Sequence, residues 1–460
     1  MRLCTVDSPS RSLTDRLRDL SGPGTPPSGT PVSPDSASET IDRLRRLIAR
    51  IEADVDRGTT ASTQHPVHIE DVVTGRFMET PHGRVFSTRT ETPLGARYGR
   101  SEVSLEPLLS PISPTMARVA RDARAEGVSL SRFLYLDTET TGLATTSGTF
   151  AFLIGIGFVD GTLFIVEQYF ARDYDEEPAL LWALAERMRG FDGIVTYNGR
   201  AFDIPLLQAR FATNRSFDPP IPNLHLDMLY PARQLWRARR VGCSLGSLER
   251  DVLGVGRELD VPGAMIPGIY LTALRTGDTS ALRPVFEHNV HDILSMAGLT
   301  ACAVRLLGRE VAKSSTAEDV LSLARIVERE NALDAVGLYT AATEGEFRSE
   351  VSREESLCRL GVLHRRLGNR DEAVRTFSRI ATEGSVFRPF ALVELAKHLE
   401  HAEREFEEAV RMARRAREAV LNLETRGMEP SAEFRVTAEE IDHRLARLSA
   451  RAVGAPWRRS

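Results

Sequence analysis

Two acidic residues at the end of an apolar segment are the first positions in this sequence that can do chemistry. Asp137 and Glu139 follow the segment 133–136 in FLYLDTETTG. Because strand side chains alternate between the two faces, acids two positions apart lie on the same face. Two such carboxylates can share one divalent ion. The pattern alone is not specific, since Asp175 and Glu177 have the same spacing.

Two later segments add acidic residues next to predicted elements. Asp203 ends the segment NGRAFD, which follows the apolar stretch GIVTY and begins a helix of sequence IPLLQARF. An aspartate there can instead be a helix N-cap, which is the alternative interpretation. His288 and Asp292 are four residues apart and therefore share one face of a helix. Pairs of this spacing are often solvated surface pairs, so only the combination of segments predicts a site.

The elements that must position these residues form one α/β domain over residues 131–308. Four apolar segments predict strands at 133–137, 150–159, 162–170 and 193–197. Asp160-Gly161 predicts a hairpin turn between the second and third of them. Helices are predicted at about 177–188, after position 202, and up to about 307. Antiparallel strands followed by alternating helix and strand predict a mixed sheet flanked by helices.

The rest of the chain divides into three further regions. Residues 1–39 are rich in Ser, Thr, Pro and Gly and are predicted to be disordered. Residues 40–130 begin with an amphipathic helix and continue as an accessory segment without assigned chemistry. Residues 317–450 are predicted to be all-helical, because 360–377 aligns with 395–412 after one inserted residue. The period of about 35 residues favours tetratricopeptide-like repeats that bind a protein partner, and a plain helical bundle is the alternative.

Composition narrows the class of protein. The 460 residues suffice for about three domains of roughly 150 residues each. With 59 basic and 64 acidic residues the net charge is −5, so any contact with nucleic acid has to be local. The longest uninterrupted apolar run, 150–159, is shorter than the roughly 18 residues of a membrane span, and we expect a cytoplasmic protein without a membrane partner. Four cysteines without a Cys-x-x-Cys spacing argue against a zinc knuckle or a disulfide framework.

In this order, the three acidic segments resemble the DEDD superfamily of 3′-to-5′ exonucleases, which have a ribonuclease H-like fold. The segments VTYNGRAFDIPLLQARF and EHNVHDILS are similar to the YprB-like ribonuclease H-like family. Members of that family often have tetratricopeptide-like repeats at the C-terminus. The resemblance implies that Asp137, Glu139, Asp203 and Asp292 are catalytic and bind two ions of Mg²⁺ or Mn²⁺. It also implies a hydrolase that cleaves phosphodiester bonds of single-stranded DNA or RNA by a two-metal mechanism.

The general base departs from the better-known patterns of that superfamily. One branch has a tyrosine four residues before the last aspartate, where His288 stands here. The histidine branch spaces its base five residues before, at the position of Glu287. His288 is the candidate base, because a histidine near pH 7 can accept a proton from water. His291 is the second candidate.

A basic segment with a tryptophan supplies candidate substrate contacts. Residues 228–248 carry four arginines around Trp236 and no acid. Arginine binds phosphate and tryptophan stacks on bases, so Arg233, Trp236 and Arg237 are predicted to bind the substrate. A helix with solvated arginines and a buried tryptophan is the alternative. Further predicted contacts, all close to Asp203 in the chain, are Asn198, Arg200 and Phe202.

Two other functions are consistent with the same sequence. A nucleic-acid-binding scaffold protein with a weak or inactive site would keep the fold, although the presence of all the expected carboxylates counts against it. A structure-selective endonuclease would use the same metals and would differ in how its groove admits nucleic acid.

Overall fold

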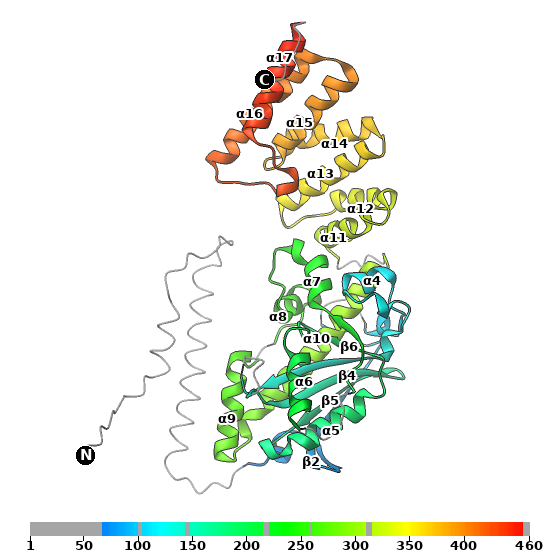
Figure 1. Ribbon diagram of the computed structural model, residues 1–460, viewed down its shortest axis with the longest axis vertical. Coiled ribbons are helices and arrows are strands. Elements are labelled where there is room, and N and C mark those ends of the chain that lie inside the picture. The colour runs from blue at the N-terminus through cyan, green and yellow to red at the C-terminus, as the bar shows by residue number, and fades with distance from the viewer. Residues whose placement is uncertain are drawn as a thin grey trace, which may run out of the picture. The chain divides into compact units, whose positions relative to one another are not determined.

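The computed structural model describes residues 67–99, 104–142, 148–214, 220–257, 260–309 and 315–453 (Figure 1). The predicted disordered segment and the amphipathic helix after it lie outside these residues. Within them, a mixed sheet with flanking helices is followed by an all-helical region. The predicted fold class is therefore confirmed for the described part of the chain.

A seven-stranded sheet is the centre of the first region. Its strands are β1 (Arg76–Thr80), β2 (Gly83–Pro93), β3 (Phe133–Thr140), β4 (Ala151–Asp160), β5 (Leu163–Phe170), β6 (Gly193–Thr196) and β7 (Leu224–Asp227). The order is β1-β2-β5-β4-β3-β6-β7, with antiparallel pairs from β1 to β3 and parallel pairs from β3 to β7. The sheet thus begins in the accessory segment, before residue 131.

Alternate residues of β3 belong to two cores, one on each face of the sheet. Tyr135 lies in the core that includes α10 (Arg283–Leu307) from Ile293 onward, and Leu136 lies in the core that includes α5 (Glu177–Met188) and α6 (Asp203–Asn214). Positions 137 and 139 share the face of Tyr135. Their side chains are therefore directed toward α10, which packs on β3, β4 and β5.

Two glycines on β4 allow α10 to lie close to the sheet. A Cβ atom at Gly155 would overlap the side-chain amide of Asn289, and one at Gly157 would overlap Cγ2 of Ile293. Gly155 is also the residue opposite Asp137 in the β3–β4 register. The missing side chain at position 155 therefore helps to set the distance between Asp137 and α10.

Shorter helices complete the first region. They are α3 (Ile69–Val72), α4 (Pro114–Val119), α7 (Leu229–Leu235), α8 (Leu245–Leu248) and α9 (Ile266–Thr276). A π-helical turn, Glu249–Leu253, continues α8 and ends at Gly254 in the left-handed conformation. Such turns are often found next to functional sites.

One described helix has the length and apolar composition that could span a membrane. It covers Ser280–Leu307, and 67% of its most apolar window is buried inside the structure. That burial is what the core helix of a folded domain also shows. Polar residues interrupt its sequence, so it contains no long uninterrupted apolar run.

The second region is all-helical and packs each helix on the next. Its helices are α11 (Ala317–Glu328), α12 (Ala332–Glu344), α13 (Glu350–Arg366), α14 (Arg370–Glu383), α15 (Arg388–His398), α16 (Phe406–Thr425) and α17 (Ala438–Ala452). The core that contains α10 continues into α11 and α12. A buried ion pair between Arg239 and Asp319 adds a polar contact between the two regions.

The aligned segments 360–377 and 395–412 occupy equivalent helix pairs, α13–α14 and α15–α16. The second pair contains a π-helical turn, Leu399–Glu403, before Arg404 in the left-handed conformation. A π turn holds one residue more than an α turn, so it accounts for the inserted residue in the alignment. The internal repeat is therefore visible as repeated helix pairs, and their tetratricopeptide-like identity stays a prediction.

Candidate active site

The two acids of β3 and the acid of α6 meet at the carboxyl end of β3. Asp137 and Glu139 are partly exposed there, and Asp203 is the first residue of α6 and only 9% exposed. Oγ1 of Thr138, which lies between the two acids of β3, donates a hydrogen bond of 2.7 Å to Oδ1 of Asp203. This bond connects the start of α6 to β3. The side chain of Asp203 therefore has a contact outside its own helix, which the N-cap interpretation does not include.

Asn289 on α10 fixes the orientation of Asp137. Its Nδ2 donates a hydrogen bond of 2.8 Å to Oδ2 of Asp137, and its Oδ1 accepts one of 2.9 Å from Nε2 of Gln168. Asn289 is fully buried. Gln168 on β5 therefore determines which end of the amide faces Asp137.

His288 and Asp292 lie one turn apart on α10, as predicted. Nδ1 of His288 lies 2.6 Å from Oδ1 of Asp260, and Nε2 lies 3.6 Å from Oδ2 of Asp292. If the Nδ1 proton is donated to Asp260, the neutral ring keeps a free electron pair on Nε2. Burial lowers the pKa of His288, but the charge of Asp292 and the hydrogen bond to Asp260 outweigh it and raise the pKa above its ordinary value.

Arg257 joins Asp292 to a buried glutamate. Its Nε lies 2.9 Å from Oε2 of Glu249, its Nη1 lies 3.1 Å from Oδ2 of Asp260, and its Nη2 donates to Oδ1 of Asp292. The Arg257 side chain is 10% exposed and that of Glu249 is 2% exposed. Oγ of Ser295 on α10 donates a further hydrogen bond to Glu249. The π-helical turn that carries Glu249 thus supports the site through Arg257.

These groups line a pocket of about 360 Å³. Its lining residues are Gly246, Glu249, Arg250, Val255, Arg257, Asp260, His288 and Asp292. The pocket is therefore lined by the candidate base His288 and by one of the predicted carboxylates, Asp292.

The four predicted carboxylates are close enough to affect one another. Burial raises the pKa of Asp137 well above its ordinary value, and the charges of Asp292, Glu139 and Asp203 raise it further. Burial raises the pKa of Glu139 to about 7. Burial also raises the pKa of Asp203 to about 6, against the hydrogen bond from Thr138. The cluster is therefore costly to charge without a cation.

The donor set fits hard divalent cations. Carboxylate oxygens are the ligands that Mg²⁺ and Mn²⁺ prefer, and clustered acids with raised pKa values gain most from a cation. As they stand, no three His, Cys, Asp or Glu side chains among the described residues converge closely enough to hold a metal ion. Asp203 is bonded to Thr138 and Asp292 to Arg257. Ion binding thus requires some of these side chains to change partners.

The loop after β6 is held by a buried aspartate of β7. Backbone N–H groups of Asn198 and Arg200 donate to the two carboxylate oxygens of Asp227, at 2.8 and 3.1 Å. Asn198 has φ of 66°, in the left-handed region. Asp227 is 1% exposed. The loop that leads to Asp203 therefore has a fixed shape next to the carboxylates.

The predicted substrate contacts divide into exposed and buried residues. The ring of Phe202, next to Asp203, is 49% exposed. Arg233 and Arg237 are exposed as well. Trp236 is 1% exposed and belongs to the core around α10, so its predicted role in base stacking is wrong and the core alternative applies. An indole packed on all sides cannot offer a face to a base.

Not every arginine of the basic segment is available to a substrate. Arg239 is buried, and it makes ion pairs with Asp251 and Asp319 at 3.0 and 2.5 Å. Its charge is therefore neutralised inside the protein. The acids that neutralise it lie outside the segment 228–248, so the local count of charges could not reveal the pairing.

The second Asp-x-Glu sequence has a structural role. Glu177 accepts hydrogen bonds from Arg210 and Asn214 of α6, and Asp175 is exposed to solvent. The same spacing therefore supports helix packing at 175–177 and a cluster of acids at 137–139.

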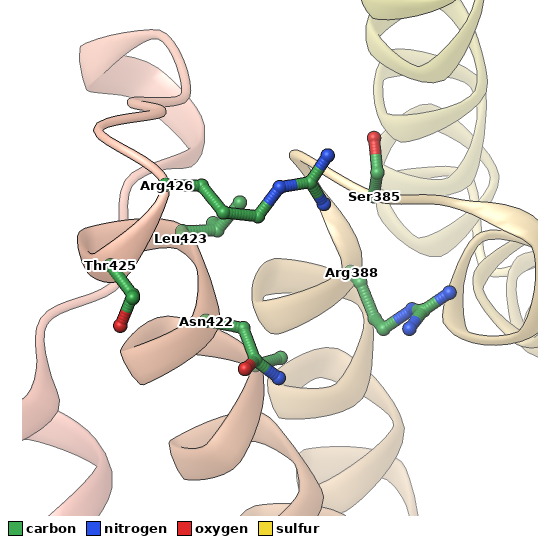
Figure 2. Close-up of a pocket in the computed structure, with 7 residues that line it drawn as sticks. Ser385, Arg388, Asn422, Leu423, Thr425 and Arg426 are labelled. Atoms are coloured by element: carbon green, nitrogen blue, oxygen red, sulfur yellow. The ribbon is translucent and has the colours of Figure 1, made fainter.

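A pocket of about 290 Å³ lies in the helical region, between the start of α15 and the end of α16 (Figure 2). Arg388 and Arg426 line it with Ser385, Asn422 and Thr425. No carboxylate or histidine is among its lining residues. It offers no group for acid–base or metal chemistry.

Comparison with known proteins agrees with the fold of the first region. A family described as the RNase_H superfamily matches residues 134–304. A protein of Bacillus subtilis (strain 168), named "Uncharacterized protein YprB", is 28% identical over 327 residues, which are 70% of this chain and 78% of that protein. The chain thus contains a ribonuclease H-like domain and has a distant similarity to YprB. A domain of this superfamily suggests an activity on nucleic acid.

Proposed function

We propose that the protein is a metal-dependent nuclease that hydrolyses phosphodiester bonds of single-stranded DNA or RNA, with 3′-to-5′ exonuclease action as the leading mode. One observation carries the proposal: hydrogen bonds connect the end of β3 to both α10 and α6, from Asn289 to Asp137 and from Thr138 to Asp203. The charges of Asp292, Glu139 and Asp203 accordingly raise the pKa of Asp137, after burial as the largest cause. Acids from three separate elements therefore lie near one end of the sheet, where charging all of them without a cation is costly.

The carboxylates of Asp137, Glu139, Asp203 and Asp292 would hold the ions. When two divalent ions are bound, they activate a water molecule and stabilise the leaving oxygen of a phosphodiester. The protein supplies the position of these acids: Asn289 holds Asp137, and Thr138 holds Asp203. No residue is needed as a covalent nucleophile in this chemistry.

His288 would accept the proton of the attacking water at Nε2. Asp260 supports this role, because a hydrogen bond to Nδ1 leaves Nε2 free. His291 stays the second candidate, and its Nδ1 is buried without a hydrogen-bond partner among the described residues. Nδ1 of His291 is therefore not in a position to exchange a proton with water, which favours His288.

Substrate contacts would come from both sides of the carboxylates. Asn198 and Arg200 are held by Asp227, and Phe202 offers an exposed ring on which a terminal base can stack. Arg233 and Arg237 are exposed cations that can bind phosphates farther along the strand. The helical region would bind a protein partner.

Cleavage of end-labelled substrates tests the proposal. Single-stranded DNA and RNA, labelled at the 5′ end, are incubated with Mg²⁺ or Mn²⁺ and the wild type, Asp137→Asn or Asp175→Asn. We expect a metal-dependent ladder that shortens from the 3′ end, is absent for Asp137→Asn and with EDTA, and is unchanged for Asp175→Asn. Cleavage of a circular single strand would favour the endonuclease. Equal binding without cleavage by wild type and Asp137→Asn would favour the scaffold protein.

A further inference from the structure

Arg257 is a largely buried cation at the edge of the carboxylate cluster. Three acids surround its guanidinium group: Glu249 at Nε, Asp260 at Nη1 and Asp292 at Nη2. A guanidinium group keeps its charge over the whole pH range in which proteins are folded. The group is therefore a permanent positive charge within reach of the cluster.

Asp292 is the carboxylate of the cluster that this charge neutralises. Asp137 accepts from a neutral amide and Asp203 from a neutral hydroxyl, whereas Asp292 accepts from a guanidinium group. A divalent cation at Asp292 would lie next to Arg257, and two cations at that distance repel each other strongly. A cation at Asp292 would therefore weaken the ion pair between Asp292 and Arg257, and Arg257 would in turn weaken binding of the cation.

We propose that Arg257 is a built-in counter-ion that competes with a divalent cation for Asp292, and that it binds an oxygen of the substrate phosphodiester once the cation has displaced it. The inference rests on the proposed function, because it assumes that the cluster binds metal. In the metal-free protein Arg257 stabilises the charge of Asp292. In the protein with bound metal the same side chain binds a phosphate oxygen of the substrate.

The other contacts of Arg257 explain why displacement leaves it in the site. Nε stays bonded to Glu249, which is buried and held by Ser295, and Nη1 stays near Asp260. Only Nη2 loses its partner. Because Arg257 and His288 line the same pocket, the freed N–H donors face the space beside the proposed base. A phosphate oxygen is the acceptor that suits a guanidinium group there.

Direct Mn²⁺ binding tests the competition. Isothermal titration calorimetry of the full chain with Mn²⁺ compares the wild type with Arg257→Gln, Arg257→Lys and Arg210→Gln. Arg210 of α6 is the matched control, because it is a largely buried arginine whose partner, Glu177 of α5, is not an acid of the cluster. We expect Arg257→Gln to bind Mn²⁺ about five- to tenfold more tightly than the wild type, the size of a typical coupling between sites. Arg210→Gln should match the wild type.

Arg257→Lys keeps the test valid if Arg257→Gln does not fold. Lysine keeps the charge, but its donors are all on one nitrogen atom. It therefore lacks the planar arrangement of donors that binds Glu249, Asp260 and Asp292 together. We expect Mn²⁺ affinity between those of the wild type and Arg257→Gln. Mn²⁺ affinity of both variants equal to or weaker than that of the wild type would overturn the inference, provided that Asp137→Asn abolishes binding. No Mn²⁺ binding by the wild type or by either Arg257 variant would instead overturn the metal site, and with it the proposed function.

Oligonucleotide binding tests the second half of the exchange. Fluorescence anisotropy with a hydrolysis-resistant single-stranded phosphorothioate measures affinity with Mn²⁺ and with EDTA. We expect Arg257→Gln to weaken binding about tenfold with Mn²⁺ and to leave it unchanged with EDTA, because Arg257 is then held by Asp292. Equal weakening under both conditions would show that Arg257 reaches the substrate without displacement, and would overturn the exchange.

Discussion

Asp260 and His288 lie 28 positions apart in the chain, and Oδ1 of the aspartate is 2.6 Å from Nδ1 of the histidine. A carboxylate in this place accepts the Nδ1 proton and thereby selects the tautomer with a free Nε2. This tautomer is the one that the proposed general base His288 needs. The contact would make Asp260 a positioning residue of the proposed site.

Replacement of Asp260 by asparagine should reduce kcat about 10- to 100-fold, the usual effect of losing a group that orients an active-site histidine. The hydrogen bond to Asp260 raises the pKa of His288, so its loss should move the lower limb of the pH–rate profile to lower pH. The profile is the decisive readout, because a loss of stability alone would not shift it. An unmoved profile would remove Asp260 from this role.

Replacement of His288 by alanine should reduce the rate about 10²–10⁴-fold, which is the typical contribution of a general base. Metal affinity should be largely kept, because His288 is not among the proposed ligands. Single-turnover cleavage and Mn²⁺ calorimetry measure the two quantities separately. An unchanged rate would transfer the role to His291 or to bulk water.

Metal affinity should depend on pH through the raised pKa values of the cluster. Glu139, with a pKa of about 7, and Asp203, with a pKa of about 6, hold protons that a cation must displace at lower pH. We expect Mn²⁺ affinity to rise with pH and level off above about 7, with a change of about tenfold between pH 6 and 8 from Glu139 alone. An affinity that is constant from pH 5 to 8 would contradict the clustering of these acids.

Without metal, the same acids should make the fold less stable as pH rises. The ordinary pKa of Glu139 is 4.5, and the folded value is about 7. Between these values the folded state binds more protons than the unfolded state, so the free energy of unfolding falls with rising pH. This penalty is absent below about 4.5 and complete above about 7. Thermal unfolding in EDTA measures it, and Asp137→Asn should reduce it.

A methyl group at position 155 should disturb the site through α10. Gly155→Ala would push the alanine Cβ into Asn289, and we expect a loss of about 1–3 kcal/mol in the free energy of unfolding, as in other overpacked cores. Gly268→Ala in α9 is the control, because no atom lies within 4 Å of its added Cβ. That variant should gain about 0.5–1 kcal/mol. Urea unfolding that ranks the two variants the other way would contradict the close packing of α10.

The arginines of the basic segment should fall into two classes. Arg233→Ala and Arg237→Ala should weaken binding of single-stranded DNA and lower its salt dependence, with unchanged stability, because both residues are exposed. Arg239→Ala should instead destabilise the fold by about 3–5 kcal/mol, because it leaves the buried Asp319 without its cationic partner. Equal effects of the three variants on DNA binding would refute this division.

The sequence predicted the strands and helices that carry the acids, because each is a strongly apolar or periodic segment. FLYLD, FAFLIGIGFV, TLFIVEQYF and GIVTY correspond to β3, β4, β5 and β6. The sequence does not predict β1 and β2, because the short alternating segments in this part of the chain are separated by Pro and Gly. Their place in the sheet depends on pairing with β5, which is distant in the chain.

The residues that support the site had no local signal. Arg257 and Asp260 lie between helices, in a segment without periodicity, and their partners are on α10. In the sequence Asn289 is one polar residue of a helix, and its hydrogen bond to Asp137 depends on the close packing of α10 on β4 at Gly155. The prediction that Trp236 binds substrate is wrong, because a tryptophan among arginines has the same sequence pattern on a surface and in a core. Tertiary contacts decide each of these cases.

The most direct measurement is a crystal structure of the protein with Mn²⁺, with the metal located by its anomalous scattering. We expect peaks about 2.0–2.6 Å from carboxylate oxygens of Asp137, Glu139, Asp203 and Asp292, with Asp292 detached from Arg257. Anomalous density elsewhere only, or a site in which Asp292 stays paired with Arg257 and no cation touches Asp137, would contradict it.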